Sequence, residues 1–323
     1  MPVGMPPRAA TLPLMIVQGD WHEARDLAQV TRSIGSPLER HMALTILGTL
    51  ARHQGDSAQA WEMVREILPR GPASEPGEAL FPYAIETLRL AVRLSLDAVE
   101  PAAARDWLET HDRWLAWSGA VRDRAESSLL WAQLHRLDGD LRRAKRCARE
   151  ALDLASEPRQ PLTLLAVQRL LGRIALDAED HDEAEEHLEQ ARSLADTCAA
   201  PYEYARTLLD ISELYLLTHR VNGVPPLLDN VRDTAAELEA APLSAAVEAF
   251  EARLEARASE SPLTARETDV LRLVTEGITD AEVADRLYIS PRTVGQHLRS
   301  VYNKLGVSSR TAATRRAVED GLV

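Results

Sequence analysis

Four side chains with long hydrogen-bonding groups recur at helical spacing near the end of this chain: Arg292, Gln296, Arg299 and Asn303. At about 100° per residue these positions share one side of a helix. The opposite side carries an apolar stripe of Val294, Leu298, Val301 and Leu305. Arginine reads guanine edges, glutamine and asparagine read adenine edges, and the DNA major groove admits a single helix. The pattern therefore predicts a helix that packs through one face and reads DNA bases with the other.

Capping signals predict the helices that position this reading helix. Ser290 suits its N-cap and Pro291 its first position. Two capping boxes begin two earlier helices, the first at Thr264 and Glu267 and the second at Thr279 and Glu282. These helices are expected to bury Val270, Leu271 and Val274, then Val283, Ala284 and Leu287. A fourth helix is predicted from Ser308 or Ser309 to about Glu319, so residues 263–323 form a helix-turn-helix unit.

The charge distribution supports a nucleic-acid partner for this unit only. The chain carries a net charge of −13, which argues against a general polyanion binder. From Leu287 to Val318, however, there is no Asp or Glu, and this run holds six cations: Arg292, Arg299, Lys304, Arg310, Arg315 and Arg316. Such a run can supply the phosphate contacts that dominate DNA affinity. The alternative is a solvated basic helix without a partner.

Residues 263–323 resemble the DNA-binding domain of the LuxR family of bacterial transcription regulators. The resemblance rests on Leu-Thr-Ala-Arg-Glu at 263–267, Ser-Pro-Arg-Thr-Val at 290–294 and Lys-Leu-Gly-Val at 304–307. It implies a homodimer that pairs through the fourth helix and places the third helix in double-stranded DNA. It assigns base reading to Arg292, Thr293, Gln296 and Arg299, and backbone contacts to Lys304 and Arg310. The full predicted DNA-contacting set also includes Thr279, Ser290, Val294, Gly295 and Asn303.

Gly295 departs from the family pattern, because many relatives carry Lys or Arg there. A glycine inside a helix costs on the order of 1 kcal/mol relative to alanine. It permits close approach to DNA, or it marks a base contact that is missing in this chain. The target sequence therefore cannot be taken from relatives.

The preceding residues repeat with a period of about 40. Six register positions, each after a tight turn, are Ala24, Ala60, Ala104, Ala144, Ala184 and Val224. Apolar stretches of helical length flank each turn, without strand signals. An all-α solenoid of helix pairs is therefore predicted over residues 1–258, with a capping helix from about Leu243 to Arg257 and a linker at 259–262. The repeats are similar to tetratricopeptide units and to the sensor region of MalT-type LuxR regulators.

The groove of such a solenoid is expected to bind an effector, which is a peptide, a protein or a small molecule. Trp107, Trp114 and Trp117 share one side of a predicted helix and are candidates for lining that groove. The alternative is that they pack between repeats, as aromatic stripes at helical spacing usually do.

Other chemistry finds no support in the sequence. The chain's two lysines, Lys145 and Lys304, lie outside any phosphate-binding glycine loop, so no ATP-binding module, cofactor or enzyme is expected. His181 and His187 lie on different faces of a helix, and Cys147 and Cys198 are too far apart in sequence for a zinc motif. Two cysteines and no long apolar run predict a cytoplasmic protein without a membrane or metal partner.

The sequence therefore predicts a dimeric DNA-binding transcription regulator, with RNA polymerase as a candidate partner, whose repeats sense an effector. The alternative is a signalling adaptor, in which the repeats bind proteins and the last 61 residues are a degenerate docking module. The intact polar face of the reading helix argues against the adaptor. The sequence does not determine the promoter, the effector, or whether the output is activation or repression.

Overall fold

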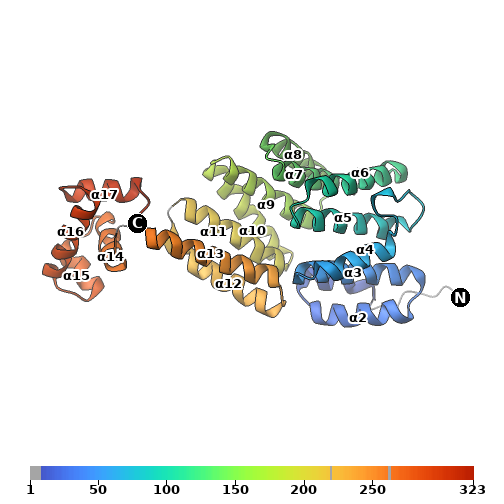
Figure 1. Ribbon diagram of the computed structural model, residues 1–323, viewed down its shortest axis with the longest axis horizontal. Coiled ribbons are helices and arrows are strands. Elements are labelled where there is room, and N and C mark those ends of the chain that lie inside the picture. The colour runs from blue at the N-terminus through green and yellow to red at the C-terminus, as the bar shows by residue number, and fades with distance from the viewer. Residues whose placement is uncertain (1–8, 219, 261–262) are drawn as a thin grey trace. The chain divides into compact units, whose positions relative to one another are not determined.

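A computed structural model describes residues 9–218, 220–260 and 263–323, and it contains helices and no strands within them (Figure 1). The all-α prediction is confirmed. Contacts between Cα atoms divide the chain into two compact units. The first comprises Met1–Leu214 and Pro226–Val247, and the second comprises Tyr215–Pro225 and Glu248–Val323. Within the described residues, none of the helices has the length and apolarity needed to cross a bilayer.

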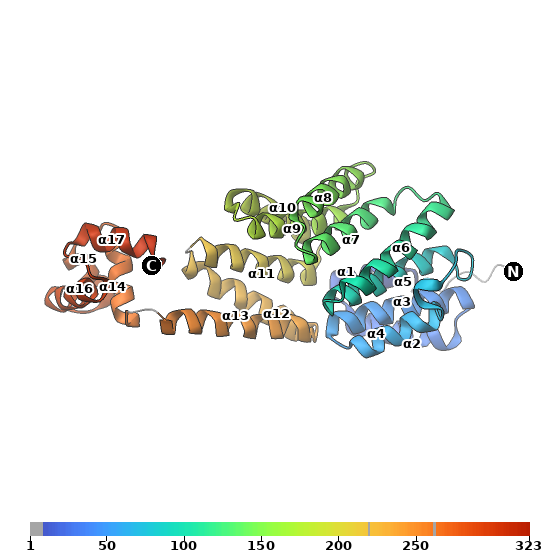
Figure 2. The same cartoon turned by 45° about the horizontal axis from the view of Figure 1, so that its top comes forward.

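The repeat region consists of successive antiparallel helix pairs that stack side by side (Figure 2). The pairs are α1 (Leu12–Gln18) and α2 (Trp21–Ile34), α3 (Pro37–Gln54) and α4 (Ser57–Ile67), α5 (Phe81–Asp97) and α6 (Pro101–Ser118), α7 (Arg124–Leu137) and α8 (Leu141–Ser156), α9 (Pro161–Asp177) and α10 (His181–Thr197), and α11 (Pro201–Leu217) and α12 (Val224–Glu237). Helix α13 (Ala241–Glu260) follows them. Three short 3-10 helices complete this region: η1 (Ala9–Thr11), η2 (Gly71–Ala73) and η3 (Val221–Gly223).

The repeat period has a packing origin. Each of the six register positions has no exposed surface: Ala24, Ala60, Ala104, Ala144, Ala184 and Val224. Each lies in the first turn of the second helix of its pair, where that helix packs against the first. A small side chain there lets the two backbones approach closely. Aspartate begins several of these helices for a local reason, since Asp56, Asp140 and Asp180 each accept a hydrogen bond from the backbone N–H three residues later.

The turn within each of the first five pairs contains one residue with a left-handed backbone. Gly19, Gly55 and Gly139 supply it at φ 88°, 89° and 78°, where glycine has no steric penalty. At the equivalent places in the third and fifth pairs, Val99 and Glu179 adopt φ 57° and 59°. A β-branched residue in this region is strained by about 1–2 kcal/mol.

Exchanging the residue types at two of these turns tests the strain. Val99→Gly is expected to raise the free energy of unfolding of the repeat region by about 1 kcal/mol, because Val99 is 66% exposed and loses little packing. Gly139→Val is expected to lower it by about 1–2 kcal/mol, because a Cβ there meets no atom within 4 Å and only the backbone is penalised. Urea titration followed by tryptophan fluorescence reports on this region, since all six tryptophans precede residue 132. A destabilised Val99→Gly variant would contradict the strain argument.

The two ends of the repeat array meet within the first unit. The rings of Trp21 and Tyr202 lie 5.2 Å apart between centroids, and those of His53 and Tyr202 lie 4.3 Å apart. The Gln54 side-chain amide donates to the Leu238 carbonyl at 3.2 Å. Residues from the first two pairs thus contact α11 and the turn after α12, because the array curves back on itself.

The second unit contains the four helices of the predicted helix-turn-helix region: α14 (Ala265–Thr275), α15 (Asp280–Leu287), α16 (Pro291–Leu305) and α17 (Arg310–Glu319). Both predicted capping boxes are present, at Thr264 and Thr279. Of the predicted linker, Ser259 and Glu260 belong to α13, and Ser261 and Pro262 lie outside the described residues.

Candidate nucleic-acid interface

Helix α16 is held in place through its apolar stripe. Val294 and Leu298 pack with residues of α14 and α15, and Val301 packs with Ala313 and Ala317 of α17. The helix begins at Ser290, whose hydroxyl accepts the Thr293 backbone N–H at 3.1 Å. It ends at Gly306, which supplies the left-handed residue at φ 64°. Packing on three helices fixes which side of α16 faces outward.

The outward side carries the row predicted from the sequence: Arg292, Gln296, Arg299 and Asn303. All four residues are exposed. Within residues 263–323, none of these four side chains forms an ion pair or a hydrogen bond to the protein. Their donors and acceptors are therefore free for a ligand at no internal cost. Two guanidinium groups and two amides spaced three or four residues apart match the chemistry of base edges.

Other cations of the acid-free run are already paired inside the domain. Lys304 Nζ lies 2.6 Å from Glu267 Oε2. Arg310 binds the Asp280 carboxylate and donates to the Ile278 carbonyl. Arg316 pairs with Asp320. The predicted backbone contacts of Lys304 and Arg310 stay predictions, but either side chain would have to share its partner with a phosphate.

Glu267 ties α14 to α16. Its buried carboxylate accepts hydrogen bonds from Ser300 Oγ at 2.5 Å, Lys304 Nζ at 2.6 Å and the Thr264 backbone N–H at 2.7 Å. Burial alone would raise its pKa, but these bonds outweigh burial and lower the pKa of Glu267 to about 2. The capping-box carboxylate at the third position of α14 thus also orients the helix that presents the polar row.

Protonating Glu267 is expected to loosen the domain. Its unfolded pKa near 4.5 lies above the folded value of about 2, so its contribution is complete above pH 4.5 and is lost as the pH falls toward 2. Glu267→Gln should lower stability at pH 7 by roughly 2–3 kcal/mol and remove this pH dependence. Hydrogen exchange of peptides from α14 and α16, followed as a function of pH, measures this loss of stability. Glu276→Gln, at an exposed pair with Arg286, is the control. Equal protection in both variants would contradict this role of Glu267.

The remaining predicted DNA contacts are three residues at helix N-termini, one core residue and one glycine. Thr279 and Ser290 use their hydroxyls at helix N-termini, and Thr293 Oγ1 lies 2.8 Å from Ser290 Oγ. Val294 is fully buried, which corrects its inclusion among the DNA-contacting residues, because the apolar stripe places it in the domain core. Gly295 lies in open space, where an added Cβ meets nothing within 4 Å.

The predicted tryptophan groove does not coincide with the concave pocket of the repeat region. That pocket has a volume of about 980 Å³ and is lined by α1, α3, α5, α7, α9 and α11, whereas the tryptophans belong to α6. Trp114 is fully buried, and its indole N–H points to the Ser74 carbonyl at 3.4 Å. Trp107 is buried beside Trp61, and Trp117 is exposed. The surroundings of Trp107 and Trp114 fit packing against the loop after α4.

The sequence interpretation missed the arginines of this pocket. Arg89 and Arg169 are buried, although arginine side chains usually remain exposed. The available signal is an arginine inside an otherwise apolar stretch, as in Thr-Leu-Arg-Leu at 87–90. A buried arginine requires partners, which marks such a position as structural or ligand-binding.

Comparisons with known proteins assign the two parts separately. Residues 261–317 match the family model of bacterial regulatory proteins, luxR family. A protein of Mycobacterium bovis named as a helix-turn-helix-type transcriptional regulator is 49% identical over 59 residues, which are 18% of this chain and 7% of that protein. The transcriptional regulatory protein ComA of Bacillus subtilis is 44% identical over 61 residues, which are 19% of this chain and 28% of that protein. The chain thus matches a small part of its curated relatives.

A Rap protein, solved in complex with Competence and Sporulation Factor, resembles the fold of this chain. Its TM-score is 0.58 at 13% identity, and the alignment covers 96% of this chain and 85% of that one. This likeness supports the tetratricopeptide-like helical fold and nothing beyond the fold. The C-terminal luxR-type domain and the helical repeats predicted from the sequence are both confirmed.

Proposed function

We propose that this chain, whose C-terminal helices form a luxR-type helix-turn-helix domain, is a sequence-specific DNA-binding transcription regulator. The observation that carries the proposal is the unpaired row of Arg292, Gln296, Arg299 and Asn303 on α16. Family membership of residues 261–317 supports it. The row enters the major groove, and two copies pair through α17 so that two α16 helices reach successive grooves.

The repeats, which we assign to residues 1–258, are proposed to sense an effector and to change the availability of the DNA-binding domain. RNA polymerase is the candidate partner once the domain is on DNA. The Rap protein of similar fold is complexed with Competence and Sporulation Factor, and we propose by analogy that this array also holds a bound partner.

Selection of bound sequences from a random duplex DNA pool tests the proposal. The full chain and residues 259–323 are used in parallel. A two-fold symmetric motif enriched by both proteins is the expected result. Enrichment by the fragment alone would indicate that the repeats inhibit DNA binding. No enrichment by either would overturn the proposal in favour of the signalling adaptor.

Gly295→Ala separates the two explanations of this glycine. Because nothing occupies the space around it, the alanine is expected to stabilise α16 by roughly 0.5–1 kcal/mol. Slower hydrogen exchange in α16 would report this gain, and unchanged exchange would contradict it. If Gly295 lets DNA approach closely, affinity for the selected motif falls despite the added stability. Unchanged affinity means instead that this position makes no contact.

A further inference from the structure

The inner surface of the repeat region forms one large pocket within the first unit. The first helix of each of the six pairs lines it. Its volume of about 980 Å³ lies at the upper end of the range for ligand pockets, which is about 300–1,000 Å³. A ligand that touches opposite walls must therefore be larger than a single small anion.

The pocket is rich in arginine, in a chain whose net charge is −13. Eight arginines line it against five carboxylates. Several arginines are matched, as Arg52 is with Asp97 and Arg93 is with Glu126. Arg136 and Arg173 meet Asp177 and Asp210, which stand behind the lining. Acidic side chains thus hold the arginines of the wall in place but do not fully neutralise their positive charge.

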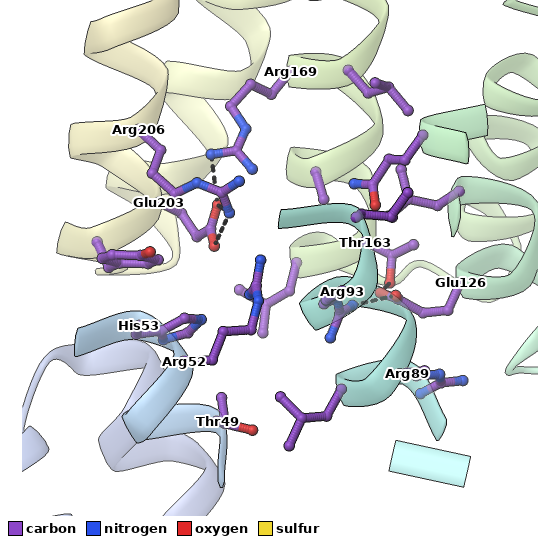
Figure 3. A pocket seen from close by; sticks show the side chains of 18 of the residues that line it. Thr49, Arg52, His53, Arg89, Arg93, Glu126, Thr163, Arg169, Glu203 and Arg206 are labelled. Atoms are coloured by element: carbon purple, nitrogen blue, oxygen red, sulfur yellow. Dashed lines mark hydrogen bonds and ion pairs between the residues drawn. The ribbon is translucent and has the colours of Figure 1, made fainter. Parts of the chain in front are cut away.

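The shortage of negative charge is concentrated where α9 faces α11 (Figure 3). Arg169 is 6% exposed. Its Nη1 lies 2.9 Å from Glu203 Oε2 but is not aligned for a hydrogen bond, and no other described group bonds it. Glu203 is shared with Arg206, whose Nη1 lies 3.2 Å from Oε1. Burial, together with the charge of Arg206, lowers the pKa of Arg169 to about 10. Asp210 lies 4.0 Å from Arg169 Nε and 3.6 Å from Arg173 Nε. Two carboxylates, Glu203 and Asp210, therefore serve three guanidinium groups.

The other walls contribute further groups that point into the same space. Figure 3 shows Arg52 directed toward the Arg169, Glu203 and Arg206 cluster from α3, with Arg93 on α5 facing the pocket from another side. Gln133 and Gln160 also line the pocket. Their amides can both donate to and accept from a peptide backbone. Cations on separate helices, together with the two amides of the lining, suit a ligand that carries several carboxylates along a chain.

We propose that this pocket binds a short acidic peptide, with one carboxylate taken by the cluster of Arg169, Arg173 and Arg206 on α9 and α11. A second carboxylate is taken by Arg52 and Arg93 on the opposite wall. The inference rests on the proposed function, in which the repeats sense an effector, and it names the class of that effector. Buried arginines that lack full pairing gain charge-assisted hydrogen bonds when the carboxylate arrives.

In the test, the full-length protein is incubated with a random heptapeptide pool. Protein-bound peptides are separated from free ones by gel filtration and sequenced by mass spectrometry. Retained peptides should be enriched in Asp and Glu at two or more positions. Arg173→Gln should weaken binding of the best peptide by roughly 10- to 100-fold, the loss of one charge-assisted hydrogen bond. Arg192→Gln on α10 is the matched control. The two arginine side chains are 41% and 42% exposed, each with an acidic partner, but Arg192 lies outside the pocket.

Retention of neutral or basic peptides, no retention, or equal loss in the Arg173→Gln and Arg192→Gln variants would overturn the proposal. So would thermal stabilisation by citrate or ATP without peptide retention, which would identify a small-anion pocket. Arg169→Gln is a second pocket variant, and its fold is checked by circular dichroism. DNA selection with the same preparation keeps the two proposals separate. A DNA motif without peptide retention rejects the ligand alone, and retention without a motif rejects the regulator alone.

Discussion

Replacing both Gln296 and Arg299 by alanine is expected to abolish most of the sequence preference of this protein for DNA. Both side chains are exposed on α16 and make no internal bond within residues 263–323, so their removal leaves the domain intact. Each base contact is worth roughly 1–3 kcal/mol of discrimination, so the pair contributes roughly 2–6 kcal/mol. Fluorescence anisotropy with the selected motif and with a scrambled duplex measures the difference.

Lys304→Ala provides the contrast. A backbone contact carries no sequence information, so its loss should weaken motif and scrambled DNA about equally. Because Lys304 pairs with Glu267, this variant should also weaken the contact between α14 and α16. Hydrogen exchange measures that effect separately from DNA binding. If the double variant and Lys304→Ala lost motif and scrambled binding in the same proportion, the assignment of base readers would be rejected.

Replacing Trp114 by alanine is expected to lower the free energy of unfolding of the repeat region by about 3–5 kcal/mol. Trp114 is 0% exposed and lies against the loop that follows α4, so its removal leaves a cavity that this loop cannot readily fill. Trp117 lies one turn away on the same helix and is 60% exposed. Trp117→Ala should therefore change stability by less than about 0.5 kcal/mol. Urea titration with tryptophan fluorescence compares them.

The pair of variants also decides between the two interpretations of the tryptophan stripe. Packing predicts a large loss of stability for Trp114→Ala and unchanged retention of peptides by the folded Trp117→Ala protein. A ligand-lining role predicts the reverse, with peptide retention lost in Trp117→Ala and little loss of stability in Trp114→Ala. That second outcome would move the effector site from the inner helices to α6.

The amino-acid sequence by itself determined the features that depend on neighbours within a few residues. The capping boxes at Thr264 and Thr279 and the Ser290 cap set where three helices begin. Helical spacing separated the buried stripe of α16 from its exposed row. The 40-residue period located the small residues at which paired helices meet. Each of these results follows from hydrogen bonds and side-chain directions inside one helix or one turn, which the local sequence specifies.

The tertiary structure alone decided which charges are free and which surfaces face a ligand. Lys304 and Arg310 look equivalent to Arg292 and Arg299 in the sequence, but their partners lie 37 and 30 residues away. The contact between Trp21 and Tyr202, and the convergence of arginines from several helices, depend on the curvature of the whole array. That curvature accumulates from small rotations between successive pairs. No single repeat contains it, so it becomes visible only when all the pairs are packed together.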